Sequence, residues 1–122
     1  MKKTVSLLKA LGENNRLRAF HALLLHEHLC LCEIAELLDI APSTASRHMS
    51  LLAEAGAVTC QKRGKWVYYG LSGNLDSRFL QWLTDSLAAD SSLKEDDIRL
   101  RALLEHHECN CPSRTEKALS KL

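Results

Sequence analysis

The chain has 122 residues, of which 46% are hydrophobic, 25% charged and 5% aromatic. This composition fits one small globular domain and leaves too few residues for a second hydrophobic core. The 16 Lys and Arg residues nearly balance the 15 Asp and Glu residues, which excludes an acidic disordered chain and a uniformly basic coat for nucleic acid. Any nucleic-acid surface must therefore be local.

No apolar run approaches the roughly 20 residues that cross a bilayer, and the first residues lead into a mixed sequence in place of a hydrophobic signal segment. We therefore expect a cytoplasmic protein without a membrane partner. The sequence shows no glycine-rich phosphate loop, no nucleophile elbow and no Cys-x-x-Cys near a βαβ pattern. We expect neither an enzyme nor a protein substrate.

Apolar residues recur at helical spacing along most of the chain, so we expect a mainly helical fold. The pattern predicts a short helix over about residues 5–11 that ends at Gly12. A second helix is predicted over about 14–27, beginning at a capping Asn14 or Asn15.

A third helix is predicted from near Cys30 to Leu38, because its apolar residues keep the spacing of a buried stripe. A three-residue turn over 39–41 separates it from a fourth helix over about 42–55. Pro42 suits the first turn of that helix, and Gly56 suits its end. The segment reads as helix, turn, helix.

The periodicity changes after Gly56. Residues 57–62 and 65–71 are rich in Val, Thr, Tyr and Trp and are separated by Arg63-Gly64, which predicts a β-hairpin. Two more helices are predicted over about 75–88 and 94–108, followed by a loosely ordered tail. The fold class is mainly α with a small β-hairpin, in the order four helices, two strands and two helices.

Positive charge is concentrated in one part of the chain. Residues 42–73 carry a net charge of +3 and residues 74–108 a net charge of −4. A helix-turn-helix followed by a hairpin with a basic tip is typical of a winged helix, whose second helix enters the major groove while the wing contacts the DNA backbone or minor groove. The expected DNA-binding residues on the fourth helix and hairpin tip are Ser43, Thr44, Ser46, Arg47, His48, Lys62, Arg63 and Lys65.

The five cysteines form two Cys-x-Cys pairs, Cys30 with Cys32 and Cys109 with Cys111, while Cys60 stands alone. In a reducing cytoplasm such pairs indicate metal or redox chemistry, not a disulfide framework. We expect Cys60, which lies in a predicted strand, to be a small core hydrophobe.

The segment 28–38, with its Leu-Cys-x-Cys-Glu-Ile box, resembles the ArsR/SmtB family of metalloregulatory repressors, as do Ser46-Arg47-His48-Met49 and Lys65-Trp66-Val67-Tyr68-Tyr69. The resemblance covers about residues 5–87, and its box is similar to the metal-binding box of arsenite-responsive and cadmium/lead-responsive members. It implies a homodimer, built by the first and last helices, that binds an inverted-repeat operator in double-stranded DNA and releases it on binding the inducer. Residues 1–108 would form the winged helix-turn-helix DNA-binding and dimerisation domain, and residues 109–122 a Cys-containing C-terminal tail.

Arsenite sensors with this box usually carry a third cysteine where this chain has Ala35. As(III) prefers three thiolates, so the third sulfur would come from Cys109, Cys111, Cys60, a partner chain or a small-molecule thiol. The sequence leaves these sources open, and we favour the C-terminal pair. The resemblance thus implies As(III) or Sb(III) as inducer, with Cys30, Cys32, Cys109 and Cys111 as candidate ligands.

Two alternatives stay open. One is a repressor for Cd(II), Pb(II) or Zn(II) with four thiolates, because thiolate sulfur also selects these ions. The other is a redox-sensing repressor whose cysteines oxidise. We disfavour a zinc site on the last helix, because the adjacent His106 and His107 splay apart on a helix.

The spacing of the first cysteine pair also suggests a switch. Residues two apart on a helix differ by about 200° in direction, so Cys30 and Cys32 should point away from each other. An ion with bonds of about 2.3 Å would then bind both only by unwinding the first turn. That strain would reach the fourth helix, over about 42–55, through the short turn at 39–41.

Overall fold

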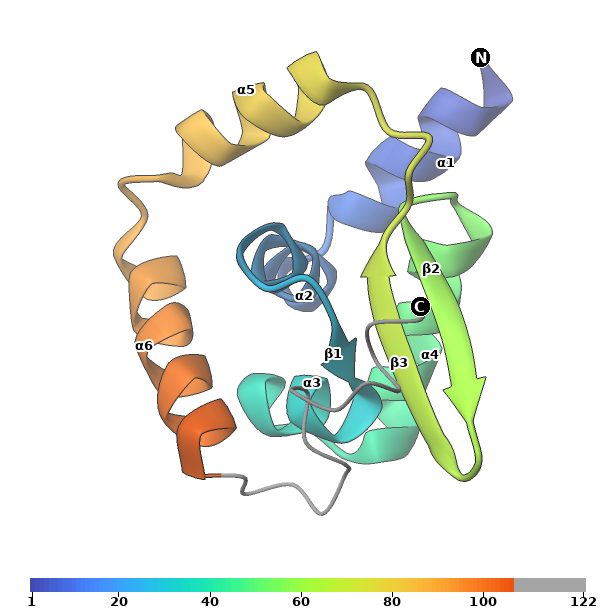
Figure 1. Ribbon diagram of the computed structural model, residues 1–122. Helices are drawn as coiled ribbons and strands as arrows, with labels where there is room; N and C mark the ends of the chain where they lie inside the picture. Colours follow the sequence, from blue (N-terminus) through green and yellow to red (C-terminus); the bar gives the residue numbers. More distant parts are fainter. Residues whose placement is uncertain (107–122) are drawn as a thin grey trace.

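The computed structural model describes residues 1–106 of the chain (Figure 1). Its helices are α1 (Lys2–Leu11), α2 (Asn14–Leu25), α3 (Leu31–Leu38), α4 (Pro42–Glu54), α5 (Ser77–Leu87) and α6 (Ser91–His106), and its strands are β1 (Leu29–Cys30), β2 (Val58–Arg63) and β3 (Trp66–Leu71). This order confirms the predicted class of a mainly helical fold with a small β element. The predicted tail over 109–122 lies outside the described residues. Within 1–106, no helix is long and apolar enough to span a membrane.

The start of α2 differs from the prediction. Its N-cap is Glu13, with extended backbone, and the Glu13 carboxylate accepts a hydrogen bond of 3.0 Å from the backbone N–H of Arg16. Asn14, a predicted cap, is already helical. The longer Glu side chain satisfies an N–H of the first turn that has no partner within the helix.

The helix-turn-helix is confirmed. α3 ends at Asp39, whose φ of 55° is left-handed and turns the chain out of the helix. Pro42 occupies the first turn of α4 as predicted, and Gly56, with a φ of 80°, follows its last residues. Met49 and Leu52 of α4 are fully buried, also as predicted.

The sheet contains a strand that the sequence did not predict. Within residues 1–106 the strands form a three-stranded antiparallel sheet in the order β1-β3-β2, with Leu29 opposite Tyr69 and Cys30 opposite Tyr68. β1 has two residues, too few to show a periodic pattern. The hairpin turn is shifted by one residue: Arg63 pairs with Trp66, so the turn is formed by Gly64 and Lys65, not by Arg63-Gly64.

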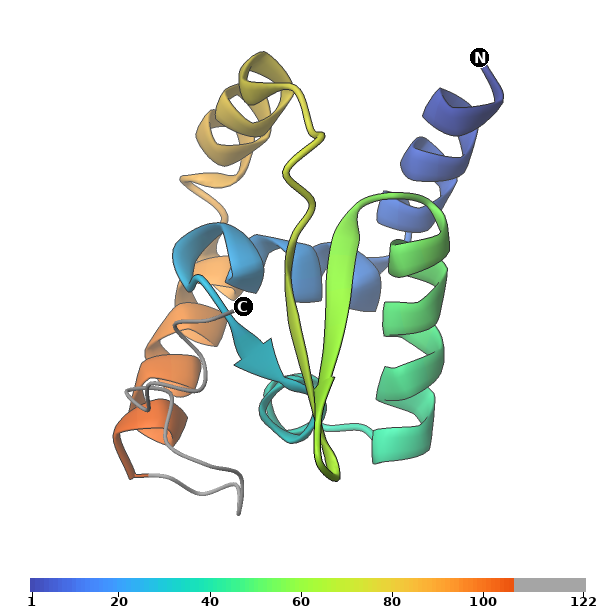
Figure 2. The same ribbon diagram turned by 45° about the vertical axis from the view of Figure 1, so that its right-hand side comes forward.

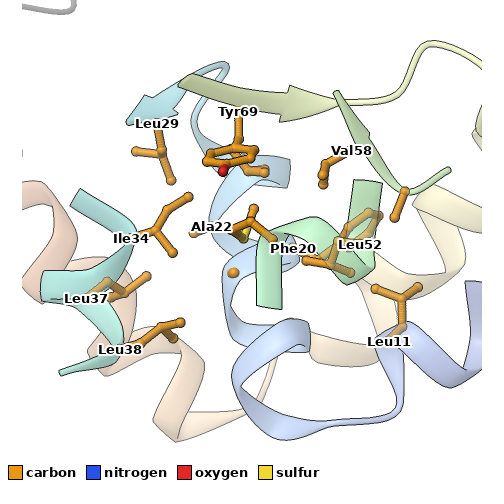
Figure 3. Close-up of a cluster of buried hydrophobic side chains, with 14 of the residues drawn as sticks. Leu11, Phe20, Ala22, Leu29, Ile34, Leu37, Leu38, Leu52, Val58 and Tyr69 are labelled. Carbon is orange, nitrogen blue, oxygen red and sulfur yellow. The ribbon is translucent and has the colours of Figure 1, made fainter. Parts of the chain in front are cut away.

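The hydrophobic core lies between the helices and one face of the sheet. Figure 3 shows Leu29, Tyr69 and Val58 pointing from the strands toward Phe20 and Ile34 on the helices. Phe20, Leu29 and Ile34 are fully buried. Both ribbon views show α1 and α5 projecting toward one end of the molecule, while the hairpin tip and the start of α4 lie at the opposite end (Figures 1 and 2).

The last helix is joined to α2 by an ion pair and to α3 by a hydrogen bond. It begins at Ser91, three residues before the predicted start. Asp96 on α6 accepts two hydrogen bonds from Arg18 of α2, at 2.8 and 3.0 Å. Arg18 and Arg99 also donate to the backbone carbonyl of Leu37, at 3.3 and 2.9 Å. These bonds connect α2 and α6 to the last turn of α3.

Candidate nucleic-acid interface and cysteine pair

The fourth helix exposes the polar side that the sequence predicted. Ser43 and Arg47 are exposed, and Thr44 and Ser46 are half-buried. Ala45 is buried on the opposite side of α4, together with the core residues Met49 and Leu52. The N-terminal half of α4 therefore presents hydroxyls, a guanidinium and a helix N-terminus to solvent, which are groups that bind phosphates and base edges.

His48, the remaining predicted residue on this helix, has contacts within the chain. Its Nδ1 lies 3.2 Å from Nη1 of Arg16 and 3.8 Å from Oε1 of Glu13. Burial raises the pKa of Glu13, but backbone hydrogen bonds from Arg16 and Asn15 and the charges of His48 and Arg16 outweigh it, so the pKa is lowered. His48 thus contacts the start of α2 from α4.

The hairpin places its cations near the same end of the molecule. Lys62 and Lys65 are exposed and Arg63 is half-buried, close to the turn at Gly64. The Lys65 Nζ lies 5.2 Å from the centre of the Trp66 ring, a cation–π distance. The hairpin tip and the start of α4 lie at the same end of the molecule (Figure 2).

The geometry of the first cysteine pair contradicts the expectation that the two side chains diverge. Cys30 is the extended N-cap of α3, with φ −83° and ψ 161°, and it is the last residue of β1. Its Sγ lies 2.8 Å from the Sγ of Cys32 in the first turn. The angle of about 200° applies only when both residues are helical, whereas a capping side chain turns back over the first turn. Both sulfurs can therefore face one ion without unwinding of the helix.

Cys30 is held from both sides. It has no exposed surface, and its backbone N–H donates to Oε1 of Glu33 at 2.8 Å within a capping box. The Cys30 side chain also packs with Tyr68, which is 3% exposed, and Cys32 and Trp66 pack against these two. Sequence reasoning missed Tyr68 and Trp66 as neighbours of the pair, because their proximity depends on the unpredicted strand β1.

Cys60 is not a core residue, contrary to the prediction. It is exposed on β2, which is an edge strand of the sheet, and it pairs with Tyr69 on β3. Burial, and secondly the Cys60 side chain, raise the pKa of Tyr69 to about 12. A strand residue is buried only where another element covers its side chain, and periodicity alone does not reveal whether an outer strand is covered.

Cys30 and Cys32 supply two of the ligands that a site for a soft metal or metalloid ion needs. Two thiols in contact are donors of the kind that As(III), Sb(III) and Cd(II) prefer. Within residues 1–106, no three His, Cys, Asp or Glu side chains gather as a metal site would require. The other predicted ligands, Cys109 and Cys111, lie outside the described residues, as does His107.

The chain is similar in sequence to known bacterial regulatory proteins. Residues 13–59 match the model of the bacterial regulatory protein, arsR family. The cadmium resistance transcriptional regulatory protein CadC of Listeria innocua is 43% identical over 61 residues, which are 50% of this chain and 51% of the relative. The arsenical resistance operon repressor of Escherichia coli K12 is 40% identical over 73 residues, 58% of this chain and 61% of that protein.

The fold also matches solved structures. HlyU from Vibrio cholerae superposes with a TM-score of 0.64 at 29% sequence identity, covering 71% of this chain and 94% of that one. The chain spans about half the length of the CadC relative that it matches. The matched segment contains α2, α3 and α4 and both sulfurs of the first cysteine pair. Over residues 13–59 the chain is therefore similar to the helix-turn-helix domain of the arsR family of bacterial regulatory proteins.

Proposed function

We propose that this chain is a metal(loid)-responsive transcriptional repressor that binds operator DNA as a homodimer and releases it when a soft ion binds. The observation that carries the proposal is the contact between Cys30 and Cys32 at the first turn of α3, because α3 is the first helix of the helix-turn-helix. An ion bound there would release DNA by binding the two conformations of the helix-turn-helix with different affinities, as any allosteric effector must.

The proposed DNA surface consists of the start of α4 and the tip of the wing. Exposed Arg47 is the candidate for reading a base edge, since arginine binds guanine O6 and N7 with two hydrogen bonds. Lys62, Arg63 and Lys65 would neutralise phosphates, and Ser43, Thr44 and Ser46 would fix the register of the helix on the backbone. His48 belongs to this set as a residue that positions α4 through its contacts with Arg16 and Glu13.

The proposed homodimer buries apolar side chains of the first helix and the C-terminal helices. Val5 and Leu8 on α1 are 41% and 57% exposed, and Trp82 on α5 and Ile98 on α6 are 62% and 69% exposed. In the proposed homodimer these exposed apolar side chains would be removed from water. Two copies would present two recognition helices, which suits an inverted-repeat operator.

The proposed inducer is As(III) or Sb(III), bound by Cys30, Cys32 and a sulfur of the pair Cys109 and Cys111. The E. coli relative is an arsenical resistance repressor, and thiolate softness favours these ions. A second candidate is Cd(II), held by all four of these cysteines, which Pb(II) or Zn(II) would also suit. The similarity to a cadmium resistance regulator favours this second candidate.

The deciding experiment is anaerobic fluorescence anisotropy of the reduced protein on a duplex from its own upstream region, titrated with arsenite and separately with cadmium. We expect release by arsenite at about one equivalent per site. Release by cadmium alone would favour the four-thiolate alternative. Failure of both ions to release the duplex would refute a metal(loid) inducer.

Substitutions test ion-induced release and DNA binding separately. Cys30→Ser and Cys32→Ser should each keep DNA affinity and lose release, whereas the matched control Cys60→Ser should behave like the natural protein. Arg47→Ala should weaken DNA binding by about 1 to 3 kcal/mol and relax the sequence preference. Unchanged affinity and preference in Arg47→Ala would remove this residue from the interface.

A further inference from the structure

The outer face of the sheet connects the cysteine pair to the wing. Cys30 and Tyr68 are directly opposite each other on β1 and β3, and both side chains are buried in one cluster. Side chains two apart on a strand share a face, so Trp66 lies on the same face as Tyr68, one step closer to the tip. Trp66 pairs with Arg63 and carries the Lys65 ammonium over its ring.

We propose that Tyr68 and Trp66 are positioning residues that transmit ion binding from Cys30 and Cys32 to the wing. The inference rests on the proposed function and specifies how ion binding at the cysteine pair would alter the hairpin. The signal would pass along β3 to the cations of the hairpin tip, in addition to any effect through the turn at 39–41. In this route the wing changes its position on the DNA backbone when the ion binds.

The packing gives the physical reason. The sulfurs of Cys30 and Cys32 are in contact with each other, and an ion bound to both would lie about 2.3 Å from each sulfur. Binding therefore adds the volume of the ion next to a buried thiol and displaces the side chains packed around it. Cys30 has no exposed surface and Tyr68 is 3% exposed, so neither side chain can move freely. Close-packed interiors transmit such displacements to their neighbours.

The hydrogen bonding of α3 directs this displacement toward the sheet. The Cys30 backbone is fixed by Glu33 on one side and by pairing with β3 on the other. At its other end, α3 is held by Arg18 and Arg99, which donate to the Leu37 carbonyl. Among the described residues, the aromatic pair packs with Cys30 on the outer face, and its member nearer the hairpin tip, Trp66, is only half-buried and so has room to move.

The first test needs no DNA. The chain has two tryptophans, Trp66 and Trp82, so Trp82→Phe leaves Trp66 as the single tryptophan reporter. The probe is phenylarsine oxide, which needs only two thiols: two As–S bonds replace the As–O bond, the two thiol protons leave with the oxygen as water, and no electron is transferred. We expect one adduct on Cys30 and Cys32 by peptide mass spectrometry and a stoichiometric change in Trp66 emission. An adduct with unchanged emission would overturn the proposal.

The second test measures the coupling between ion and DNA. In the natural chain an allosteric inducer should lower DNA affinity by about 5- to 150-fold. We expect Trp66→Ala to bind the arsenical as before but to reduce this ratio to about twofold, and Trp66→Phe to restore it. Full coupling in Trp66→Ala would overturn the proposal, whereas failure of every variant to bind DNA, with the Trp66 signal intact, would refute the proposed function alone.

A thermodynamic cycle distinguishes the wing from the recognition helix. If the wing leaves the DNA when the ion binds, Lys62→Ala should weaken the affinity of the ion-free protein and have no further effect on the loaded protein. Arg47→Ala should weaken both forms by a similar factor if the recognition helix stays on its site. Equal losses for Lys62→Ala in both forms would exclude the wing route.

Discussion

The two faces of the small sheet are made from the same strands but have different neighbours. The inner face presents Leu29, Val58 and Tyr69 to the main core (Figure 3). The outer face presents Cys30 and Tyr68, with Cys32 and Trp66 packed against them, and forms a separate cluster. The inner face is covered by helices, whereas the outer cluster consists of two thiols and two aromatic rings. The main core and the cysteine pair therefore lie on opposite faces of the sheet, although Leu29 and Cys30 are adjacent in the chain.

The largest expected effect tests this division within one strand. Leu29→Ala, on the inner face, should lower the free energy of unfolding by about 2 to 5 kcal/mol, because it leaves a cavity beneath the sheet. Cys30→Ala, one residue away on the outer face, removes one atom and should cost about 1 kcal/mol. Urea unfolding of both variants measures the difference. An equal loss of unfolding free energy in both variants would contradict the view that the inner face contributes more to stability than the outer face.

A second effect appears at alkaline pH. The pKa of Tyr69 is raised to about 12 from 10.0, first by burial and then by Cys60. The unfolded chain therefore ionises at a lower pH than the folded chain, so stability is unaffected below pH 10 and falls as the pH rises from about 10 to 12. One pKa unit corresponds to about 1.4 kcal/mol, which gives a loss of about 2 to 3 kcal/mol.

Tyr69→Phe should remove this loss, and Cys60→Ala should reduce it, because burial remains the larger cause. Unfolding curves over this pH range, with tyrosinate absorbance as a direct titration, provide the measurement. An ordinary pKa for Tyr69 in the folded protein would show that the inner face admits water.

A smaller effect concerns the turn that both faces share. Gly64 has a φ of 60° and an added Cβ would meet no atom within 4 Å, so Gly64→Ala should cost about 1 kcal/mol from backbone strain alone. Gly73→Ala is the matched control, since that site is equally open and has no positive φ. Thermal unfolding should separate the two variants, and the same loss in both would contradict the left-handed turn.

The smallest effect is kinetic and compares the cysteines. Cys60 is exposed and Cys30 is fully buried, so a thiol reagent should modify Cys60 first, as peptide mass spectrometry would show. Arsenite added beforehand should protect Cys30 and Cys32 and leave Cys60 reactive. Modification of Cys30 as fast as Cys60 would mean that the outer cluster opens readily.

The sequence predicted the helix-turn-helix well because its signals are local. Apolar spacing, Pro42 and Gly56 each act within a few residues, and the structure agrees with them. The exposed polar side of α4 followed from the same periodicity. Residue types in a Cys-x-Cys box also indicated a soft-ion site, which remains a prediction.

What the sequence did not predict depends on pairing between distant segments. β1 exists because Leu29 and Cys30 align with Tyr69 and Tyr68, and two residues carry no period. The direction of the Cys30 side chain follows from this strand, so the expected divergence of the two sulfurs was wrong. Cys60 was misplaced for a related reason, since its exposure depends on what covers an outer strand.

The short strand β1 also has a consequence for how the molecule assembles. Its pairing with β3 joins positions about 40 residues apart in the chain, and closing a loop of that length costs about 3 kcal/mol of chain entropy. The contacts within α3 and α4 are local and incur little of this cost, so they should form early, and the β1–β3 ladder late. A nascent chain would then acquire its helix-turn-helix before its thiols meet the aromatic pair, and would be insensitive to the ion until the hairpin has docked.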